Sequence, residues 1–372
     1  MLSRIYIDNF RAFVKFEHRF KSTQLLLGAN GAGKTSLLQV LLTIRQLVAR
    51  GDSSDSLHFL RSRTVWLSQP KQTFEFDIDL KGSAYVYHLE IEPWGEPVRA
   101  RIAKEIVTVD GNPLLEFVAG EVRLFNDAFE LVVTYPLDSL RSALATISEA
   151  SDRMKLYALR NWFSSLFCFR LDPFAMSPVA EGEDPAPNVN LSNFAAWYRH
   201  LLQSFPQEND AFLKSLKQAM PGFRYMKLAP HLERSRGVLA EFEGPNGNGY
   251  LHFYFGELSE GQRCIIGLYA ILHFVVAKGG TVIIDEPDNF LALPEIQPWL
   301  MSVTDAVETC NAQVILISHH PEFINQWASS CGLQFIRDGA GPVRVKQFYM
   351  DPDTCLTPAE VVARGWADGN DA

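Results

Sequence analysis

The sequence predicts an α/β fold, and three kinds of segment support this prediction. An apolar run, Gln24–Leu27, leads into a glycine-rich loop, Gly28–Thr35, and then into an amphipathic helical pattern. Residues 73–117 alternate apolar and polar side chains, as an antiparallel sheet with one buried face does. Beyond residue 259, β-branched runs alternate with helical patterns, which is typical of a parallel sheet. We therefore expect a mixed sheet core, an antiparallel β subdomain and a helical insertion.

The composition is that of an ordinary globular protein with an acidic balance. The chain has 372 residues, and 43 acidic against 34 basic side chains give a formal charge of −9. This charge disfavours indiscriminate coating of nucleic acid, while a local basic groove stays open as an alternative. The five cysteines show no C-x-x-C spacing. We expect reduced thiols, not disulfides or a zinc site.

No targeting or membrane segment is expected. Charged side chains, among them Asp8 and Arg11, interrupt the first twenty residues, unlike the apolar core of an export signal. The longest nearly apolar run, Cys264–Ala277, covers fourteen residues and contains His273, so it is too short to cross a bilayer. We predict a cytoplasmic protein without a membrane partner.

The first fifty residues contain two predicted strands and one predicted helix. The strands are Arg4–Asp8 and Ala12–Phe16. The helix runs from Thr35 to Arg50, and Gly51 suits its C-terminal cap. Its apolar side chains recur on one helical face: Leu37, Leu41, Ile44 and Val48.

The middle of the chain changes from strands to helices. Turns divide the period-two region at three places: Lys81–Gly82, Pro93–Gly95 and Asp110–Asn112. Residues 131–235 form a predicted, mainly helical insertion. The proline-rich and acidic stretch Pro178–Pro187 interrupts this insertion, and we expect a mobile surface loop there.

The last third alternates strands and helices after a hairpin through Gly244–Gly249. A helix is predicted from Ser259, and the elements that follow are a strand over 281–284, a helix over 294–309 and a strand over 313–317. This order predicts that the last two strands are parallel neighbours.

The glycine-rich loop has the spacing Gly28-x-x-x-x-Gly33-Lys34-Thr35 between a strand and a helix. Glycines let the loop turn tightly, so that backbone N–H groups and the helix N-terminus point at a phosphate chain. Lys34 then reaches the outer phosphates, and the Thr35 hydroxyl ligates Mg²⁺. The predicted nucleotide-binding residues are Gly28, Ala29, Asn30, Gly31, Ala32, Gly33, Lys34, Thr35 and Ser36.

Two carboxylates follow the predicted strand over 281–284. Asp285 ends this β-branched run, where it is suited to hold Mg²⁺ together with Thr35. Glu286 comes next and is suited to polarise a water for attack on the γ-phosphate. An exposed acidic turn is the alternative. The phosphate loop earlier in the chain makes that alternative the weaker one.

Ser259 and Gln262 have the spacing of a capping box at the start of a helix. The structural interpretation is a well-capped helix. The functional interpretation is a second anion site, because a serine-capped, glycine-containing helix start suits a γ-phosphate. A head-to-tail dimer needs such a site, with Ser259, Gly261 and Gln262 of one subunit closing over the nucleotide of the other.

The predicted strand over 313–317 ends in Ser318-His319-His320. One strand on from Asp285, this cluster brings His319 or His320 beside the γ-phosphate. We select His319, with Glu286 and Lys34, as the catalytic candidates.

These four motifs in this order resemble an ABC-type ATPase head of the RecF, SMC and OLD-like group of AAA-family ATP-binding proteins. The opening Ile5-x-Ile7-x-Asn9-Phe10-Arg11-x-Phe13 is similar to that group's N-terminal hairpin, and the resemblance adds Arg11 to the nucleotide-binding candidates. Residues 258–262 resemble the signature motif, with Glu260 at a more usual glycine position. Ser318-His319 resembles the switch-histidine turn.

The resemblance covers roughly residues 1–115 and 235–345. It implies ATPase lobes at 1–130 and 236–372 that flank the insertion at 131–235. Two features depart from the family pattern. Gln69 and Gln72 are the candidates for the family's Q-loop residue, but neither has its usual context. Asn289–Pro294 stands where the family has a histidine shortly after the Asp-Glu pair.

The resemblance leaves three interpretations of the function. A transporter subunit is the weakest interpretation, because 225 residues separate Lys34 from Ser259. A RecF-like DNA repair and recombination ATPase would clamp DNA with basic clusters, for which solvated sheet or loop faces are the preferred alternative. The clusters are Lys15, His18, Arg19 and Lys21; Arg61, Arg63 and Lys71; Arg99, Arg101 and Lys104.

The third interpretation is a regulatory ATPase in bacterial defence against phage, as OLD-like heads are. OLD proteins carry a nuclease domain after the head, but only 53 residues follow His319. The resemblance therefore implies a nuclease or other effector in a separate chain. The segment Thr357–Trp366 is predicted to be a helix that either docks a partner or packs on the head. The expected cofactors are ATP and Mg²⁺, and the expected assembly is a homodimer that closes around ATP.

Overall fold

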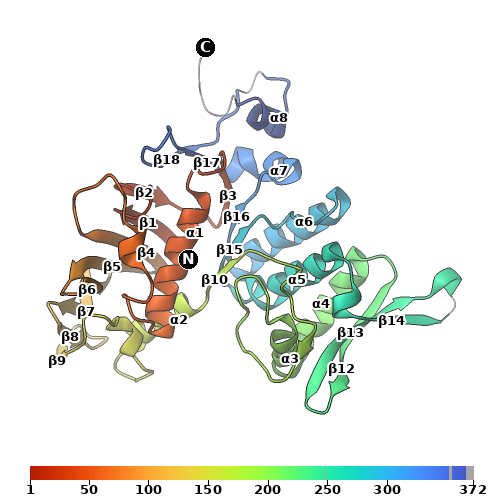
Figure 1. Cartoon of the computed structure of the whole chain (residues 1–372), viewed down its shortest axis with the longest axis horizontal. Helices are drawn as coiled ribbons and strands as arrows, with labels where there is room; N and C mark the ends of the chain where they lie inside the picture. The colour runs from red at the N-terminus through yellow and green to blue at the C-terminus, as the bar shows by residue number, and fades with distance from the viewer. Residues whose placement is uncertain (248, 352–353, 366–372) are drawn as a thin grey trace. The chain divides into compact units, whose positions relative to one another are not determined.

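The computed structural model describes residues 1–247, 249–351 and 354–365. The chain divides into two compact units (Figure 1). Unit 1 contains Met1–Leu166 and, among the later described residues, 330–351, 354 and 364–365. Unit 2 contains Phe167–Ser329 and Cys355–Ala363. The three-segment division predicted from the sequence remains a prediction.

An eight-stranded antiparallel sheet forms most of unit 1, with the order β2-β1-β4-β5-β6-β7-β8-β9. Its strands are β1 Leu2–Asp8, β2 Phe16–Arg19, β4 Gln72–Leu80, β5 Ser83–Trp94, β6 Arg99–Val109, β7 Asn112–Val118, β8 Glu121–Phe125 and β9 Leu131–Pro136. Lys81 and Gly82 both have positive φ angles, 54° and 84°. This is the geometry that a two-residue hairpin requires. The period-two prediction is therefore confirmed.

The N-terminal hairpin differs from the prediction. The expected strand Ala12–Phe16 is wrong, because pairing with β1 begins only at Phe16. Arg11 and Lys15 have left-handed φ angles of 52° and 47°. Two such residues interrupt an extended run, so the segment before Phe16 forms a compact turn instead of a strand.

Three strands of a second sheet lie in unit 1, and they hold the glycine-rich loop. Strand β3, Thr23–Leu27, pairs in parallel with β17, Gly332–Ile336, which pairs antiparallel with β18, Arg344–Gln347. Helix α1, Lys34–Arg45, follows the loop and continues as a π-helical turn, Gln46–Arg50. Gly51 closes this turn with a φ angle of 71°. The predicted helix and its glycine cap are confirmed.

The segment predicted as a mainly helical insertion contains helices and strands. The helices are α2 Met154–Ser164, α3 Phe194–Ser204 and α4 Pro206–Ala219. Strand β11, Val179–Ala180, lies inside the stretch expected to be a mobile loop and pairs with β13, Ser235–Glu243. The backbone N–H of Asp184 also donates to the carbonyl of Ala196 at 3.1 Å. These bonds join parts of the stretch Pro178–Pro187 to other segments of unit 2, and the mobility of the loop stays a prediction.

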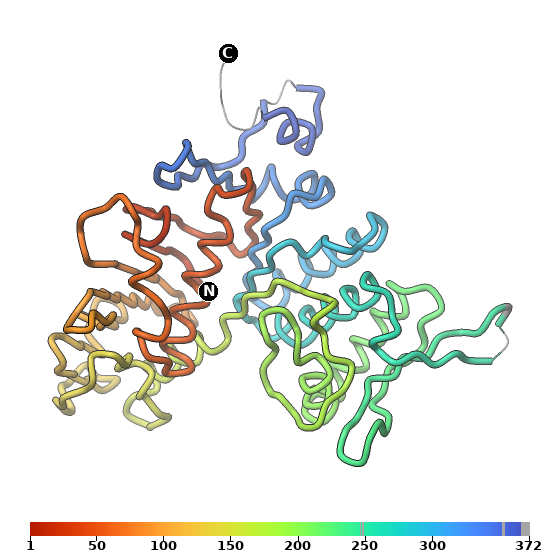
Figure 2. Tube along the Cα trace, viewed as in Figure 1, coloured from red at the N-terminus to blue at the C-terminus, as the bar shows by residue number. Residues whose placement is uncertain are grey.

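Strand β12, Phe223–Leu232, and strand β14, Tyr250–Tyr254, both pair with β13. The predicted hairpin through Gly244–Gly249 is thus confirmed, and Figure 2 shows both hairpins extending from the helices of unit 2. The other elements of this unit are β10 Leu166–Phe169, α5 Glu260–Phe274, β15 Thr281–Asp285, α6 Leu293–Cys310, β16 Gln313–Ile317, α7 Pro321–Cys331 and α8 Pro358–Ala363.

Strands β15 and β16 are parallel and pair residue by residue from Thr281 with Gln313 to Asp285 with Ile317. Within the described residues, one helical stretch, Glu260–Lys278, is long and apolar enough to cross a membrane. However, 67% of its most apolar window is buried inside the structure, as in the core helix of a globular protein.

The predicted C-terminal helix is shorter than expected. It begins at Pro358, and Thr357 shares a capping box with Glu360. The backbone N–H of Ala359 donates to the side chain of Asn325 in α7 at 3.0 Å. This bond agrees with the alternative in which the helix packs on unit 2. Trp366, the predicted end of the helix, lies outside the described residues.

Candidate functional site

The glycine-rich loop between β3 and α1 has a backbone that only glycine suits at two positions. Gly28 has a φ angle of 131°, and a Cβ there would lie 2.3 Å from the carbonyl oxygen of Phe335. Gly33 has a φ angle of 110°, and its Cβ would lie 2.6 Å from Cγ2 of Val343. The loop is therefore curled tightly against β17 and the segment that precedes β18. A tightly curled loop directs its backbone N–H groups inward, as phosphate binding requires.

Lys34 closes the loop from inside. It is the first residue of α1 and is only 7% exposed. Its ammonium donates to the carbonyl of Gly28 and, at 3.1 Å, to the carbonyl of Ala29. Gly33 at the N-cap has no side chain to satisfy the N–H groups of the first turn. A buried ammonium next to a helix N-terminus makes this loop electropositive, which suits a polyphosphate.

Arg11 belongs to the same unit as the loop. Its backbone N–H donates to the carbonyl of Ser62 at 2.6 Å, and its guanidinium is exposed, 5.9 Å from the ring centre of Phe10. The next residue, Ala12, accepts a hydrogen bond from Val343 at 2.9 Å. Val343 also contacts the loop near Gly33. The N-terminal hairpin is thus joined to the loop through one valine.

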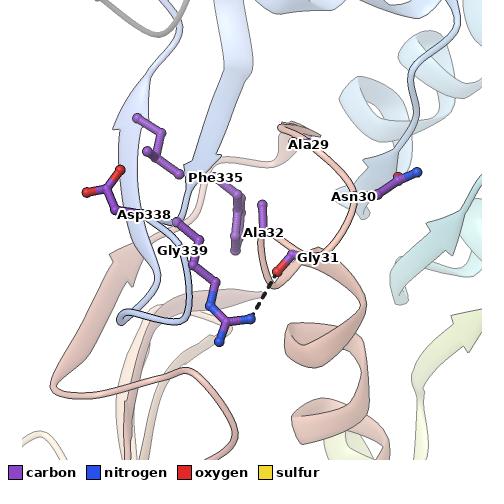
Figure 3. A pocket seen from close by; sticks show the side chains of 9 residues that line it. Ala29, Asn30, Gly31, Ala32, Phe335, Asp338 and Gly339 are labelled. Carbon is purple, nitrogen blue, oxygen red and sulfur yellow. Dashed lines mark hydrogen bonds between the residues drawn. The ribbon is translucent and has the colours of Figure 1, made fainter.

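A cavity of about 350 Å³ adjoins the loop on the side of β17 (Figure 3). Residues 29–32 form one wall and residues 335–339 form the other. The dashed line in Figure 3 marks a hydrogen bond of 3.4 Å from the Arg337 guanidinium to the carbonyl of Gly31. Sequence reasoning did not find Arg337, because it has no motif and lies 306 residues from Gly31.

The two glutamines considered for a Q-loop have structural partners in the N-terminal hairpin. The Gln69 amide donates to the Asp8 carboxylate at 2.9 Å. Gln72 is fully buried, and its amide donates to the carbonyl of Asn9 at 2.9 Å. Both side chains fasten the hairpin to the segment that leads into β4.

In unit 2, the parallel pairing of β15 and β16 brings two predicted motifs together. Asp285 lies opposite Ile317 at the carboxyl ends of these strands, so the residues that follow each strand are neighbours. The backbone N–H of Glu286 donates to the carbonyl of Ile317 at 2.8 Å. Asp285 is 3% exposed, whereas Glu286 is partly exposed. This unit therefore holds Asp285, Glu286, Ser318 and His319 at one edge of its sheet.

Glu286 has a left-handed backbone with a φ angle of 52°. A non-glycine residue in this conformation stores strain of about 1 kcal/mol, and such strain is common at functional sites. The Asn289 amide donates to the Glu286 carboxylate at 2.9 Å and orients it. Sequence reasoning noted Asn289 only as part of a departure from the family pattern. The hydrogen bond gives it a positioning role.

The two histidines after β16 have different surroundings. The His320 Nδ1 accepts a hydrogen bond from the backbone of Glu322 at 3.2 Å, so this ring caps the start of α7. His319 is exposed. The buried Ser318 hydroxyl donates to Asp288 at 2.6 Å and accepts from the backbone of His320 at 2.9 Å. These bonds fix the turn and agree with His319 as the candidate.

The predicted capping box at the start of α5 is present. The Ser259 hydroxyl accepts the backbone N–H of Gln262 at 3.2 Å, and the Gln262 side chain accepts the N–H of Ser259 at 3.0 Å. Gly261 lies so near the turn after β15 that a Cβ would be 2.9 Å from the carbonyl oxygen of Phe290. Glu260, the departure from the family motif, pairs with Arg263 at 3.6 Å. The exposed Ser259 hydroxyl is thus presented on a fixed turn.

The cysteine that follows the signature motif is not suited to nucleophilic chemistry. Burial raises the pKa of the Cys264 thiol to about 12, so the cysteine after the signature turn stays protonated. Within residues 1–247, 249–351 and 354–365, no cluster of three or more metal-ligating side chains occurs. Mg²⁺ commonly takes one or two protein ligands together with phosphates and waters, so it does not require such a cluster.

A protein-family model described as "AAA domain, putative AbiEii toxin, Type IV TA system" matches residues 25–325. The SMC head domain from Thermotoga maritima is 11% identical, with a TM-score of 0.49, and the match covers 94% of this chain and 99% of that one. The Smc head domain of Pyrococcus furiosus, solved bound to the C-terminal domain of ScpA, is 10% identical with a TM-score of 0.50. This second match covers 100% and 99% of the two chains. No curated protein matches the sequence. The structural likeness confirms the predicted fold class.

Proposed function

Because the chain belongs to this AAA-domain family and its fold is similar to that of an SMC head domain, we propose that it is an ABC-type ATPase head of the RecF and SMC group, which binds and hydrolyses ATP with Mg²⁺. The conformation of the loop Gly28–Lys34 is the observation that carries this proposal. Its glycines leave no room for side chains, and its buried lysine faces loop carbonyls. These are the properties of a polyphosphate cradle.

For hydrolysis, we assign the water-activating role to Glu286. Its carboxylate is partly exposed, held by Asn289 and set on a strained backbone next to the end of β16. His319 then stabilises the γ-phosphate as charge develops, and Lys34 neutralises the outer phosphates. Mg²⁺, when held by Thr35 and Asp285, supplies Lewis-acid polarisation of the phosphate oxygens.

The assembly we propose is a head-to-tail homodimer that closes around ATP. Ser259 and Gly261 of one subunit would cover the nucleotide bound to the loop of the other. The exposed Ser259 hydroxyl on a rigid helix start supports this role, since a helix N-terminus favours an anion. Hydrolysis removes one bridging phosphate and so favours the open form.

We further propose that this opening and closing gates a separate effector protein in bacterial defence against phage, within the cytoplasm. The family description refers to a toxin–antitoxin system, which is in line with an ATPase that works with a second protein. An effector or nuclease in another chain remains part of the proposal.

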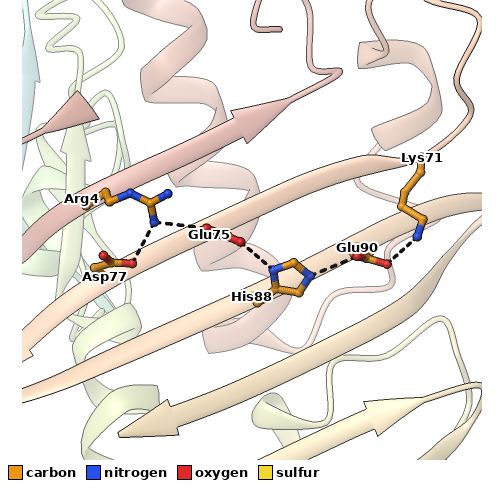
Figure 4. Close-up of polar contacts among 6 residues, drawn as sticks. All are labelled: Arg4, Lys71, Glu75, Asp77, His88 and Glu90. Atoms are coloured by element: carbon orange, nitrogen blue, oxygen red, sulfur yellow. Dashed lines mark hydrogen bonds and ion pairs between the residues drawn. The ribbon is translucent and has the colours of Figure 1, made fainter. Parts of the chain in front are cut away.

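The sheet of unit 1 gives little support to the DNA-clamping alternative. Side chains of β1, β4 and β5, together with Lys71 just before β4, form one network in which cations and carboxylates alternate (Figure 4). Arg4 contacts Glu75 at 3.1 Å, and Lys71 contacts Glu90 at 2.7 Å. His88 lies between these two glutamates. A face whose positive charges are already compensated attracts a phosphate backbone weakly.

Glu286→Gln tests the hydrolysis proposal. The amide keeps the size of the side chain but cannot accept a proton. We expect ATP binding to persist, turnover to fall by at least about a hundredfold and a dimer to accumulate on size-exclusion chromatography with ATP. Hydrolysis at the parental rate would contradict the assignment.

A mixing experiment tests the shared site. Lys34→Ala and Ser259→Arg should each abolish ATPase activity, because each spoils both sites of its homodimer. Mixing them creates heterodimers with one intact site, so part of the activity should return. If both single variants retain parental activity, the shared-site model is refuted.

A further inference from the structure

Strand β14 forms an open edge of the sheet in unit 2 that contains β12 and β13. It pairs with β13 over five consecutive residue pairs, and no other strand pairs with it among the residues that the structure describes. All five residues of β14 are exposed. The hairpin of β13 and β14 projects away from the helices of unit 2 in Figure 1, so its outer edge is accessible to another strand.

The backbone groups that face this edge belong to alternate residues. The N–H of Gly244 donates to the carbonyl of Gly249 at 3.0 Å, so these two glycines form a hydrogen-bonded pair of the hairpin. Bonded and non-bonded pairs alternate along an antiparallel ladder, so Tyr250, His252 and Tyr254 direct their backbone groups away from β13. The N–H of Tyr254 already donates to the Glu257 carboxylate at 2.6 Å. The edge therefore offers the backbone groups of Tyr250 and His252 to another strand.

Strand β14 lacks the features with which proteins usually protect an edge. It contains no proline and no lysine, and its register with β13 shows no bulge. By contrast, β9 at the edge of the large sheet ends in Pro136, and its register with β8 shifts after Leu124. A regular, apolar and exposed edge strand favours pairing with another chain.

A second copy of β14 fits this edge. In an antiparallel pair with Tyr250 of one copy opposite His252 of the other, the free backbone groups of both residues bond to each other, and Leu251 of the two copies meets on a two-fold axis. This pairing brings no like charges together. The strand contains no lysine, arginine, aspartate or glutamate, and the His252 imidazole lies 3.0 Å from the Glu241 carboxylate of its own chain.

We propose that β14 pairs antiparallel with β14 of a second copy of this chain, with Leu251 on the two-fold axis. Tyr250, Leu251 and Phe253 are 54%, 44% and 36% exposed, so two copies can bury roughly 500 Å² of their side chains, at about 200 Å² for each side chain when fully exposed. A stable interface buries about 1,200 Å² or more. The expected dimer is therefore weak and dependent on protein concentration.

This self-pairing requires no nucleotide and is separate from the proposed closure around ATP. A chain with two different self-interfaces can form assemblies larger than a dimer. All measurements below use the full chain without nucleotide, so their outcome leaves the ATPase proposal untouched.

Cross-linking tests the position of the axis. Two directly opposite residues of a non-bonded pair have Cα atoms about 4.5 Å apart, which lies within the range of a disulfide. Under mild oxidation, Leu251→Cys should give at least about five times more disulfide-linked dimer than the parent, whose exposed Cys355 sets the background. Lys227→Cys is the matched control, because Lys227 is an exposed residue of β12, two strands away from the edge. It should not exceed the background.

Charge substitution tests the symmetry of the pair. The parent should dimerise reversibly in sedimentation experiments between about 5 and 500 µM. Leu251→Lys and Leu251→Glu each place two like charges on the axis and should weaken the dimer at least about tenfold. An equimolar mixture of the two variants should regain dimers, because opposite charges then meet. Thermal melts of each variant show whether it is folded.

Three outcomes overturn the inference. In the first, the parent stays monomeric up to the highest concentration, which leaves the edge to a strand of another protein. In the second, Leu251→Cys forms no more linked dimer than Lys227→Cys. In the third, Leu251→Lys and Leu251→Glu dimerise as the parent does, which means that the dimer uses another surface.

Discussion

Acidification should destabilise unit 2 through His273, near the C-terminal end of α5. Its Nε2 lies 2.9 Å from the Ser215 hydroxyl of α4, and burial lowers its pKa from 6.5 to about 4. The folded state therefore binds fewer protons than the unfolded state between these values. The stabilisation is fully present above pH 6.5 and is lost as the pH falls from 6.5 towards 4.

The size of the effect follows from that shift. At pH 5 the medium is 1.5 units below the unfolded pKa of 6.5, which corresponds to about 2 kcal/mol at 1.36 kcal/mol per unit. His273 is partly exposed, so solvent screening reduces this to about 1 kcal/mol. A change of 1 kcal/mol moves the melting temperature of a unit of this size by about 2–4 °C.

The assay compares the parent with His273→Gln, which stays neutral at all these pH values and can still bond to Ser215. Melting temperatures are measured at pH 7.5, 6 and 5 at constant ionic strength. The variant should gain about 2–4 °C relative to the parent on going from pH 7.5 to pH 5. His252→Gln, at an exposed histidine of β14, controls for the loss of one imidazole. If the curves of parent and His273→Gln run parallel, burial of His273 does not couple to folding.

Three further substitutions test the site and the sheet. Gly28→Ala would place a methyl group 2.3 Å from a carbonyl oxygen and should lower ATP affinity at least about tenfold. Gly31→Ala places its methyl group in open space and should lower ATP affinity less. Equal losses of affinity in calorimetry would contradict the cradle geometry. Asn289→Ala releases the Glu286 carboxylate and should reduce kcat about tenfold with KM unchanged, so an unaltered kcat would remove its positioning role. Glu105 is fully buried and accepts three hydrogen bonds, so its replacement by glutamine should cost about 1–3 kcal/mol in chemical denaturation, and parental stability would refute this.

Several features of the fold and site could be predicted because they depend on residues close together in sequence. The loop from Gly28 to Lys34, the cap at Gly51 and the capping box at Ser259 each involve only a few neighbouring positions. The same holds for hairpin turns such as Lys81–Gly82, whose positive φ angles a lysine–glycine pair can adopt. Backbone geometry and nearby side chains determine such features, so the sequence by itself was sufficient.

Other features were decided only by packing between distant segments. The residue pattern favoured a second hairpin strand that begins at Ala12. In the structure the strand begins only at Phe16, because Arg11 and Lys15 have a left-handed backbone. The turn that carries His319 depends on the hydrogen bond from Ser318 to Asp288, which lies 30 residues earlier in the chain. Arg337 meets Gly31 only because β17 returns beside β3.

The physical reason is the range of the interactions. A glycine loop or a helix cap is stabilised by hydrogen bonds between residues that are close in sequence. The local sequence is therefore enough to predict it. A clamp such as that of Arg337 on the phosphate loop requires the sheet to form first, since strand pairing alone brings the two segments together. The sequence alone determined that this chain carries a phosphate loop, while the tertiary structure decided which side chains surround it.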